Sequence, residues 1–297
     1  MATHYDGSAA TVTTEQYFIP EIWADGIYKY FERKTVFRGL VDDYSSLVKG
    51  KGYGDAINVP EMSIISASDK SAGSDVAYDA TATTTTQLTL NKHKYVAKLF
   101  EDIALIQSEA DLVSKYSRMM GEALARQVDA DLWAQIEQVN QSQDLSADNT
   151  LTAGVFESVL ATLGENDIPY MDGECAMVVN PTLFADILNP SGGIAQYFIR
   201  NDAVGEGNRG LRSGMVGSMY GIDVYMSNTC DSSGTDGVVA GAVFHKSACV
   251  FASQQEVRVQ SEYSIDALGT KLVSDLLYGC KIIDDSDNIK GVALANI

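Results

Sequence analysis

The clearest candidate for chemistry is a glycine motif in the second half of this 297-residue chain. Residues 205–210 match GxGxxG, the pattern with which dinucleotide-binding proteins place a helix N-terminus against a pyrophosphate, and Asp223 could then contact the ribose. More glycines follow as far as Gly221, however, which argues against a helix, and Glu206 would repel the phosphates. We interpret this stretch as a surface loop and expect no cofactor. An alternative function, of a different class, is that of an enzyme that acts on a small molecule through this loop.

A histidine and a group of aspartates are the next candidates. His245 precedes Ser247 and Cys249, but a nucleophile needs a base positioned across a pocket, so we interpret His245 as the end of a strand. The three aspartates in residues 284–287 could bind a hard cation. Their spacing fits no calcium loop, and turns favour aspartate for backbone reasons. We therefore expect a turn there, and no enzymatic activity.

The thiols and imidazoles do not predict a metal site either. The four cysteines are far apart and contain no CxxC pair, and the chain has only three histidines. A structural zinc site needs about four closely spaced nitrogen or sulfur ligands. We interpret the cysteines as small buried apolar residues. They are Cys175, Cys230, Cys249 and Cys280.

The net charge of the chain limits the classes of partner that it can bind. Lys and Arg number 21 against 40 Asp and Glu, which gives a net charge of -19 and a pI near 4.4. A protein that grips nucleic acid through phosphates needs a basic surface. No apolar run approaches the roughly 20 residues that span a bilayer, and the N-terminus has no basic segment followed by an apolar one. We expect a soluble, globular protein made in the cytoplasm, with no membrane partner.

The elements that must position these residues begin with a helix and a long hairpin. Residues 1–16 are expected to form a mobile arm, and Pro20 opens an amphipathic helix that should end near Gly39. Two extended segments follow, from about residue 49 to 64 and from 83 to 99, with a soft stretch between them. This hairpin has too few apolar residues for its own core. It must either fold back on its own chain or lie on a neighbouring copy.

A long helix and an α/β lobe follow. Residues 108–139 repeat apolar side chains at helical spacing, which predicts a spine of about 45–50 Å, with Arg118, Glu122 and Arg126 paired on its outer face. Residues 141–149 are interpreted as a polar linker. A helix capped by Thr152, a strand over 175–179, and a helix over 182–188 begun by Asn180 and Pro181 indicate the lobe. Further strands are expected at residues 222–226, 238–244, 255–263, 270–283 and 289–294, the last four forming one sheet on the spine.

Four short motifs in this order resemble the major capsid protein of tailed bacteriophages, which has the Hong Kong 97-type fold. They are FIPEIW at residues 18–23, GSMYGIDVY at 217–225, VFHKSA at 243–248 and YGCKI at 278–282. The resemblance runs from about residue 17 to the end. It implies an α+β fold with an N-terminal arm (1–47), an extended hairpin called the E-loop (48–99), a peripheral P-domain (100–149 and 243–297) and an axial A-domain (150–242).

The same resemblance implies the function and its partners. The chain would assemble through pentamers and hexamers into an icosahedral shell around phage double-stranded DNA, with the glycine-rich loop at 192–217 facing the capsomer axis; an encapsulin-like nanocompartment is the alternative. Some members carry a fused scaffolding domain in a long N-terminal extension that is missing here, so we expect a separate scaffolding protein, besides a portal protein and room for a decoration protein. DNA would be enclosed without tight sequence-specific binding, in virions assembled in the host cytoplasm.

Seven side chains are candidates for contacts between subunits. Three of them are lysines that we expect to be exposed in the predicted hairpin. These lysines could dock onto an acidic copy of the same protein, or they could form an ordinary solvated strand face. The remaining candidates lie in the glycine-rich start of the hairpin and in the glycine-rich loop. The seven are Lys92, Lys94, Lys98, Tyr53, Arg200, Arg209 and Arg212.

Overall fold

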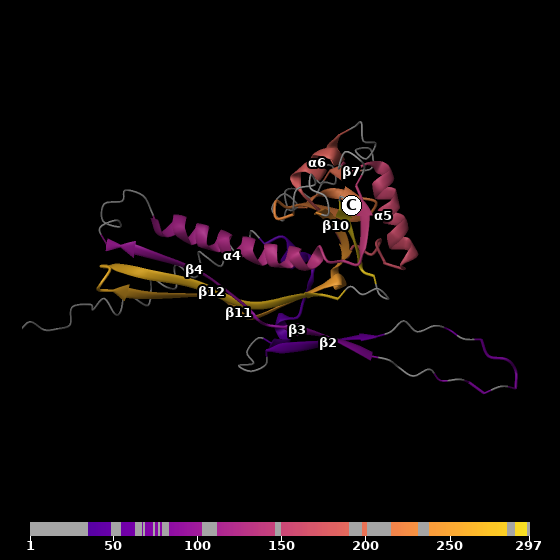
Figure 1. Cartoon of the computed structure of the whole chain (residues 1–297), viewed down its shortest axis with the longest axis horizontal. Coiled ribbons are helices and arrows are strands. Elements are labelled where there is room, and N and C mark those ends of the chain that lie inside the picture. Colours follow the sequence, from indigo (N-terminus) through magenta and orange to yellow (C-terminus); the bar gives the residue numbers. More distant parts are fainter. Residues whose placement is uncertain are drawn as a thin grey trace, which may run out of the picture.

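The chain folds into an elongated arm, a lobe at one end of the arm, and a hairpin that projects from below their junction (Figure 1). No helix in the part of the chain that is described combines the length and hydropathy needed to cross a membrane. The computed structural model describes residues 35–48, 55–62, 67, 69–73, 75–76, 78, 83–102, 112–145, 150–189, 198–200, 215–230, 238–283 and 289–295.

The arm is a four-stranded sheet covered on one face by a long helix. Its strands, in sheet order, are β1 (Asp42–Asp43), β11 (Cys249–Ser264), β12 (Gly269–Ile282) and β4 (Lys92–Glu101). The helix α4 (Leu112–Ile136) runs along the sheet (Figure 1), and at 1.5 Å per residue its length is about 37 Å. Near the far end of the arm Met120 of α4 packs with Phe100 and Leu272 of the sheet.

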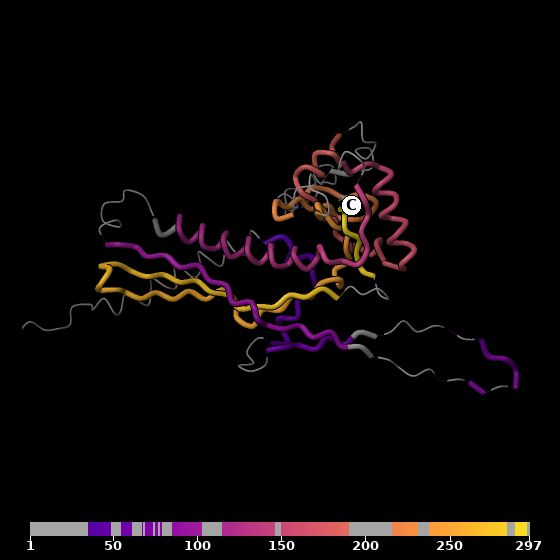
Figure 2. The backbone as a smooth tube through the Cα atoms, viewed as in Figure 1, coloured from indigo at the N-terminus to yellow at the C-terminus, as the bar shows by residue number. Residues whose placement is uncertain are grey.

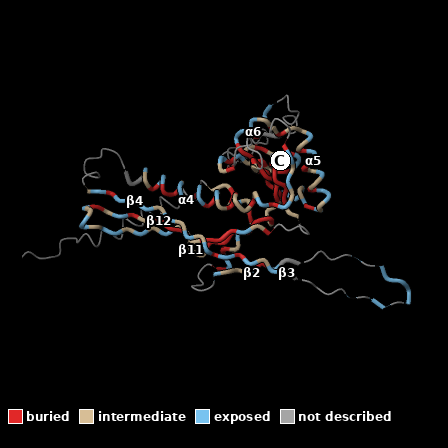
Figure 3. The backbone as a smooth tube through the Cα atoms, in the orientation of Figure 1, coloured by how far each residue is buried: buried red, intermediate tan, exposed pale blue. Residues whose placement is uncertain are grey.

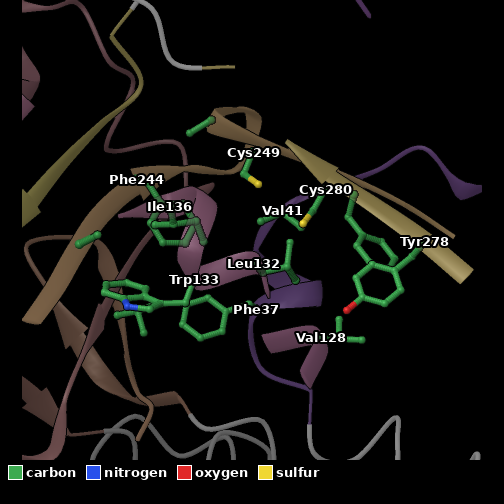
Figure 4. Close-up of a cluster of buried hydrophobic side chains, with 14 of the residues drawn as sticks. Phe37, Val41, Val128, Leu132, Trp133, Ile136, Phe244, Cys249, Tyr278 and Cys280 are labelled. Atoms are coloured by element: carbon green, nitrogen blue, oxygen red, sulfur yellow. The ribbon is translucent and has the colours of Figure 1, made fainter. Parts of the chain in front are cut away.

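The buried stripe of the spine helix follows the predicted spacing. Met120, Leu124, Val128, Leu132 and Ile136 are all buried, and Figure 4 shows the last three within a core shared with the sheet and the lobe. The predicted start near residue 108 lies outside the described residues. The helix ends at Ile136, before Val139, and the expected pair on its outer face forms, with Arg118 Nε 2.9 Å from Glu122 Oε1.

The lobe is built on a seven-stranded sheet. Two helices, α5 (Ala153–Glu165) and α6 (Pro181–Leu188), flank it (Figure 1). Its strands, in sheet order, are β5 (Gln141–Asp144), β13 (Gly291–Ala295), β10 (Val239–His245), β6 (Cys175–Val179), β9 (Ile222–Met226), β8 (Met215–Met219) and β7 (Phe198–Arg200).

Several local predictions for the lobe are confirmed. The strand β6 has the expected bounds, and the side chain of Asn180 accepts a hydrogen bond from Leu183 N at 2.7 Å at the start of α6. Thr152 is the N-cap of α5, although its side chain makes no capping hydrogen bond. The predicted linker at residues 141–149 is wrong at its start. Residues 141–144 form the edge strand β5, which needs only backbone pairing and so tolerates polar side chains.

The C-terminal strands do not form one sheet on the spine, contrary to the sequence-based prediction. β10 and β13 belong to the lobe, whereas β11 and β12 belong to the arm. Between β10 and β11 the short 3-10 helix η4 (Lys246–Ala248) carries the chain from one sheet to the other. Burial explains the division: all five residues of β13 are buried, so it needs cover on both faces, whereas the outer half of β11 alternates and has one open face.

The prediction of a single strand from residue 83 to 99 is also wrong. The hairpin consists of β2 (Ala56–Met62) and β3 (Thr83–Thr89), and the chain then enters β4, which pairs with β12 in the arm. Figure 2 shows this continuous passage from the hairpin into the arm. The break falls at Leu90, whose buried side chain and hydrogen bond to Asp55 O belong to the hairpin base.

Two short elements complete the described N-terminal part. The 3-10 helix η1 (Phe37–Leu40) places Phe37 in the central core beside Trp133, with ring centroids 5.8 Å apart (Figure 4). The helix α2 (Ser45–Val48) follows β1 and contributes Val48 to the packing under the hairpin. Most of the helix predicted from Pro20 lies outside the described residues.

Candidate inter-subunit surfaces

The base of the hairpin is held by its own chain. Leu88 and Leu90 pack with Val250 and Ala252 of β11 in a separate apolar cluster. Gly279 of β12 makes this approach feasible, because a Cβ there would lie 2.2 Å from the carbonyl oxygen of Thr89. One of the two alternatives from the sequence, folding back on the same chain, therefore applies to the base.

The described residues of the hairpin tip are not packed against the rest of the subunit. Every described residue from Ala67 to Tyr78 is exposed, including Val76 at 53% and Tyr78 at 92%. Figure 3 shows this exposed tip well away from the buried parts of the lobe and arm. Fully burying an aromatic or valine side chain is worth about 1.5–3 kcal/mol, so these two residues can contribute to binding another molecule.

The far end of the arm exposes a second apolar group. In the turn between β11 and β12, Ile265 is 78% and Leu268 62% exposed, and Tyr263 and Leu99 are exposed nearby. Tyr263 Oη donates a hydrogen bond to Asp102 Oδ2 at 2.8 Å, which raises the pKa of the phenol and ties the turn to the end of β4. The group is therefore displayed on a fixed frame.

The open face of the arm sheet carries a polar network centred on Asp275. Burial would raise the pKa of this carboxyl, but hydrogen bonds from Arg258, His93 and Gln255 outweigh it and lower the pKa. Arg258 binds both carboxylate oxygens, at 3.0 and 2.8 Å, and His93 Nε2 lies 3.0 Å from Oδ2. Such a bidentate pair fixes the spacing of β11 and β12.

The lysine candidates lie on β4, in the arm and not in the hairpin. Lys92 and Lys94 reach across to α4, with their Nζ atoms 3.6 and 3.4 Å from carboxylate oxygens of Asp131. Asp131 Oδ2 also accepts a hydrogen bond from Tyr278 Oη at 2.6 Å. These two lysines brace the spine of their own subunit, whereas Lys98 is exposed.

Of the other four predicted contact residues, the structure describes one. Arg200 is the last residue of β7, where it pairs with Gly217 of β8. The glycine motif and the aspartates at residues 284–287 lie outside the described residues, and so do Tyr53, Arg209 and Arg212.

The first described residues beyond the glycine motif, 215–226, form a hairpin. β8 and β9 are joined at Tyr220 and Gly221, whose φ angles are 49° and 86°. Such a pair of positive angles is typical of the tight turns that connect two antiparallel strands. Asp223 lies in β9, where burial raises its pKa.

The cysteines are free and buried, as expected. Burial is also the main reason that the pKa of the Cys249 thiol lies far above its ordinary value. His245 ends β10, as predicted, and its Nδ1 lies 2.9 Å from Ser247 Oγ.

Sequence reasoning missed a buried carboxyl that joins the N-terminal segment to the spine. Asp129 of α4 is 4% exposed and accepts hydrogen bonds from Val36 N at 3.0 Å and Phe37 N at 3.3 Å. Burial raises its pKa to about 7, and the two backbone donors oppose this rise. In the sequence, this buried carboxyl could have been inferred from the position of Asp129, which directly follows Val128 of the predicted buried stripe.

The comparisons with known proteins agree with this architecture. A family model described as "Phage capsid protein" matches residues 83–290. The solved structure of Mycobacterium phage Che8 has a TM-score of 0.64 at 23% identity and covers 88% of this chain and 91% of that one. The capsid of Ralstonia phage GP4 has a TM-score of 0.65 at 13% identity, with 86% and 87% covered. A comparison with curated protein sequences finds no significant match.

A more distant structure has the same fold. The virus-like particle from Pyrococcus furiosus has a TM-score of 0.58 at 9% identity, with 92% of this chain and 98% of that one covered. At these identities the structures show a common fold, the Hong Kong 97-type capsid fold. The match of the family model shows more: the chain belongs to the phage capsid protein family. It is a major capsid protein, a structural component of the virion of a tailed phage.

Proposed function

We propose that this major capsid protein assembles through pentamers and hexamers into an icosahedral shell that encloses double-stranded phage DNA. The observation that carries the proposal is the contrast within the hairpin, whose base is packed on its own subunit while Val76 and Tyr78 at its tip are exposed. A neighbouring copy supplies the missing surface for this tip.

The far end of the arm supports a second contact between copies. Ile265 and Leu268 protrude from a turn that Tyr263 and Asp102 hold in place. An ordered apolar group loses less conformational entropy on binding than a mobile one. Because each subunit of a closed shell repeats its contacts, small interfaces of this kind add up to a durable assembly. Lys98, Tyr53, Arg200, Arg209 and Arg212 remain proposed contacts.

The acidic composition suits a container for DNA. With a net charge of -19, the wall repels the genome instead of holding it, so DNA can enter and leave. Repulsion between subunits is screened beyond a Debye length of about 8 Å at physiological salt. Apolar contacts at interfaces therefore dominate over the net charge. This role requires no enzymatic activity.

The domain limits follow the sheets. We propose an E-loop that ends with β3, a P-domain made of β4, α4, β11 and β12, and an A-domain made of the seven-stranded lobe with α5 and α6. This differs from the limits expected from the sequence, which divided the lobe sheet by assigning β5, β13 and the end of β10 to the P-domain. The N-terminal arm remains residues 1–47.

Assembly in the host cytoplasm is proposed to involve a separate scaffolding protein and a portal protein, with a decoration protein as a further partner. Co-expression tests the first of these: the chain with its scaffolding protein should give uniform shells. Uniform shells of normal size from this chain alone would count against a separate scaffold.

The main experiment alters the hairpin tip. The double variant Val76→Ser/Tyr78→Ser should keep the thermal midpoint of the subunit, because both side chains are exposed, but should form few or no shells in negative-stain micrographs. The control is Asp75→Ser, which changes an exposed polar neighbour and should assemble normally. Normal shells from the double variant would contradict the proposed role of the tip.

A further inference from the structure

Three side chains that could bind a metal ion meet on the lobe, away from the surfaces described above. Asp172 and Glu174 lie just before β6, and His245 ends β10. His245 Nε2 is 3.4 Å from Asp172 Oδ2 and 3.6 Å from Glu174 Oε2, and one ligand atom from each of the three residues lies within 4.8 Å of the other two. Sequence analysis did not group them, because they come from segments about 70 residues apart.

The backbone fixes all three residues in this arrangement. His245 pairs directly with Cys175 across β10 and β6, and Lys246 N donates to Glu174 O at 3.0 Å. Asp172 Oδ1 accepts a hydrogen bond from Glu174 N at 2.8 Å, which leaves Oδ2 directed at the histidine. Gly173, between the two acids, has a φ of 83° that other residues rarely adopt. The cluster is thus part of the folded frame of the lobe.

Two of the three distances match those between the ligands of one metal ion. Zinc binds imidazole nitrogen and carboxylate oxygen at about 2.0–2.2 Å, so two ligands of a tetrahedral site are separated by about 3.4 Å. The distances from His245 Nε2 to the two carboxylate oxygens are 3.4 and 3.6 Å. All three ligand atoms lie within 4.8 Å of one another, so side-chain movement can bring them around one ion.

Ser247 positions the imidazole ring of His245. Its backbone N donates a hydrogen bond to His245 Nδ1 at 3.2 Å, and its Oγ lies 2.9 Å from the same nitrogen. In this arrangement Nδ1 accepts, and the proton on Nε2 faces the two carboxylates. An ion at Nε2 replaces that proton, and the ring then takes the tautomer in which Nδ1 donates to Ser247 Oγ, as metal-binding histidines commonly do with a neighbouring acceptor.

The three groups determine which ions the cluster can bind. They offer two carboxylates and one imidazole. This mixed set suits zinc and similar transition-metal ions better than magnesium.

We propose that Asp172, Glu174 and His245 form a binding site for one divalent transition-metal ion of the zinc class, with a water molecule as a further ligand. The ion would connect the segment before β6 to the end of β10. At that point the chain leaves the lobe sheet and continues through η4 into the arm. A bound ion would thus stiffen the joint between the two bodies of the subunit.

The test is zinc binding by the full chain after treatment with a chelator and dialysis. Titration calorimetry at pH 7.5 with zinc chloride should show one ion per chain, and zinc should raise the thermal midpoint, whereas magnesium chloride at the same concentration should do neither.

Two variants locate the ion. Glu174→Gln changes an exposed side chain, and His245→Gln removes the nitrogen ligand; each should weaken zinc binding at least tenfold. The matched control is His93→Gln, because His93 contacts a carboxylate but belongs to the network around Asp275. Equal zinc affinity in wild type and Glu174→Gln, or no binding by wild type, would overturn the proposal. The Glu174 variant keeps the test valid if the His245 variant fails to fold.

Discussion

The lobe and the arm bury their sheets in different ways. In the lobe, helices and loops enclose a core in which β6 and β13 are buried along their whole length. In the arm, α4 covers one face only; β4 alternates between half-buried and exposed residues from Lys92 to Ala97, and Lys98 and Leu99 are exposed as well. The described part of the lobe thus encloses a core of its own, whereas the arm leaves one sheet face open and every described residue of the hairpin tip is exposed. A folded lobe that is joined to extended segments with exposed surfaces is consistent with a shell protein.

The largest expected effect is on the core of the lobe. Phe156 of α5 is 1% exposed, and Phe156→Ala should lower the free energy of unfolding by about 3–5 kcal/mol, because it removes a large buried ring and leaves a cavity. Urea denaturation of the soluble subunit measures this change. A loss below about 1 kcal/mol would mean that the lobe is not the stable body of the molecule.

The next effect concerns the seat of the hairpin on the arm. Gly279→Ala would place a Cβ against the carbonyl of Thr89, and overpacking of this kind costs about 2–3 kcal/mol. Hydrogen exchange should accelerate in β2 and β3, while the lobe stays protected. Gly164→Ala in α5 is the control, since a Cβ there meets nothing within 4 Å. Unchanged exchange in the hairpin would show that its base is not held at this point.

A pH dependence should mark the joint between the N-terminal segment and the spine. The pKa of Asp129 is raised from 3.8 to about 7, so folding favours its protonated form. Its contribution to stability is fully present below pH 3.8 and is lost as the pH rises through 7. Raising the pH from 5 to 8 should therefore lower the free energy of unfolding of the wild type by about 2–3 kcal/mol more than that of Asp129→Asn.

Urea denaturation of both proteins at the two pH values measures this difference. Other titrating groups contribute equally to the wild type and to Asp129→Asn, so their contributions cancel. A difference of zero, or one of opposite sign, would show that Asp129 is ionised in the folded subunit throughout this range.

The smallest effect on stability is expected at the far end of the arm. Ile265 is 78% exposed, so Ile265→Ser should change the free energy of unfolding by less than about 0.5 kcal/mol. Assembly should nevertheless fall clearly, as measured by sedimentation of shells. If stability drops by several kcal/mol, the arm end serves folding and not contacts between subunits.

The sequence predicted elements whose signals are local. The cap formed by Asn180 and Pro181 and the apolar stripe of α4 need only neighbours along the chain, and the structure has both. The break at Leu90 was missed because both sides of it are extended, and only the choice of partner strand distinguishes them. The division of β10 and β11 between two sheets is likewise a matter of distant partners.

The candidate sites follow the same rule. The lysines Lys92 and Lys94 were recognised as a cluster, but their pairing with Asp131 depends on how α4 lies over β4. Asp172 and His245 come together only because β6 and β10 pair in one register. No spacing along the chain could indicate this contact.

The most direct test of the account is a cryo-electron microscopy reconstruction of assembled shells. The account predicts that residues 67–78 of each subunit lie against an adjacent copy, with Val76 and Tyr78 buried in that contact. A reconstruction in which these residues contact only their own subunit, or stand free in solvent throughout the shell, would contradict it.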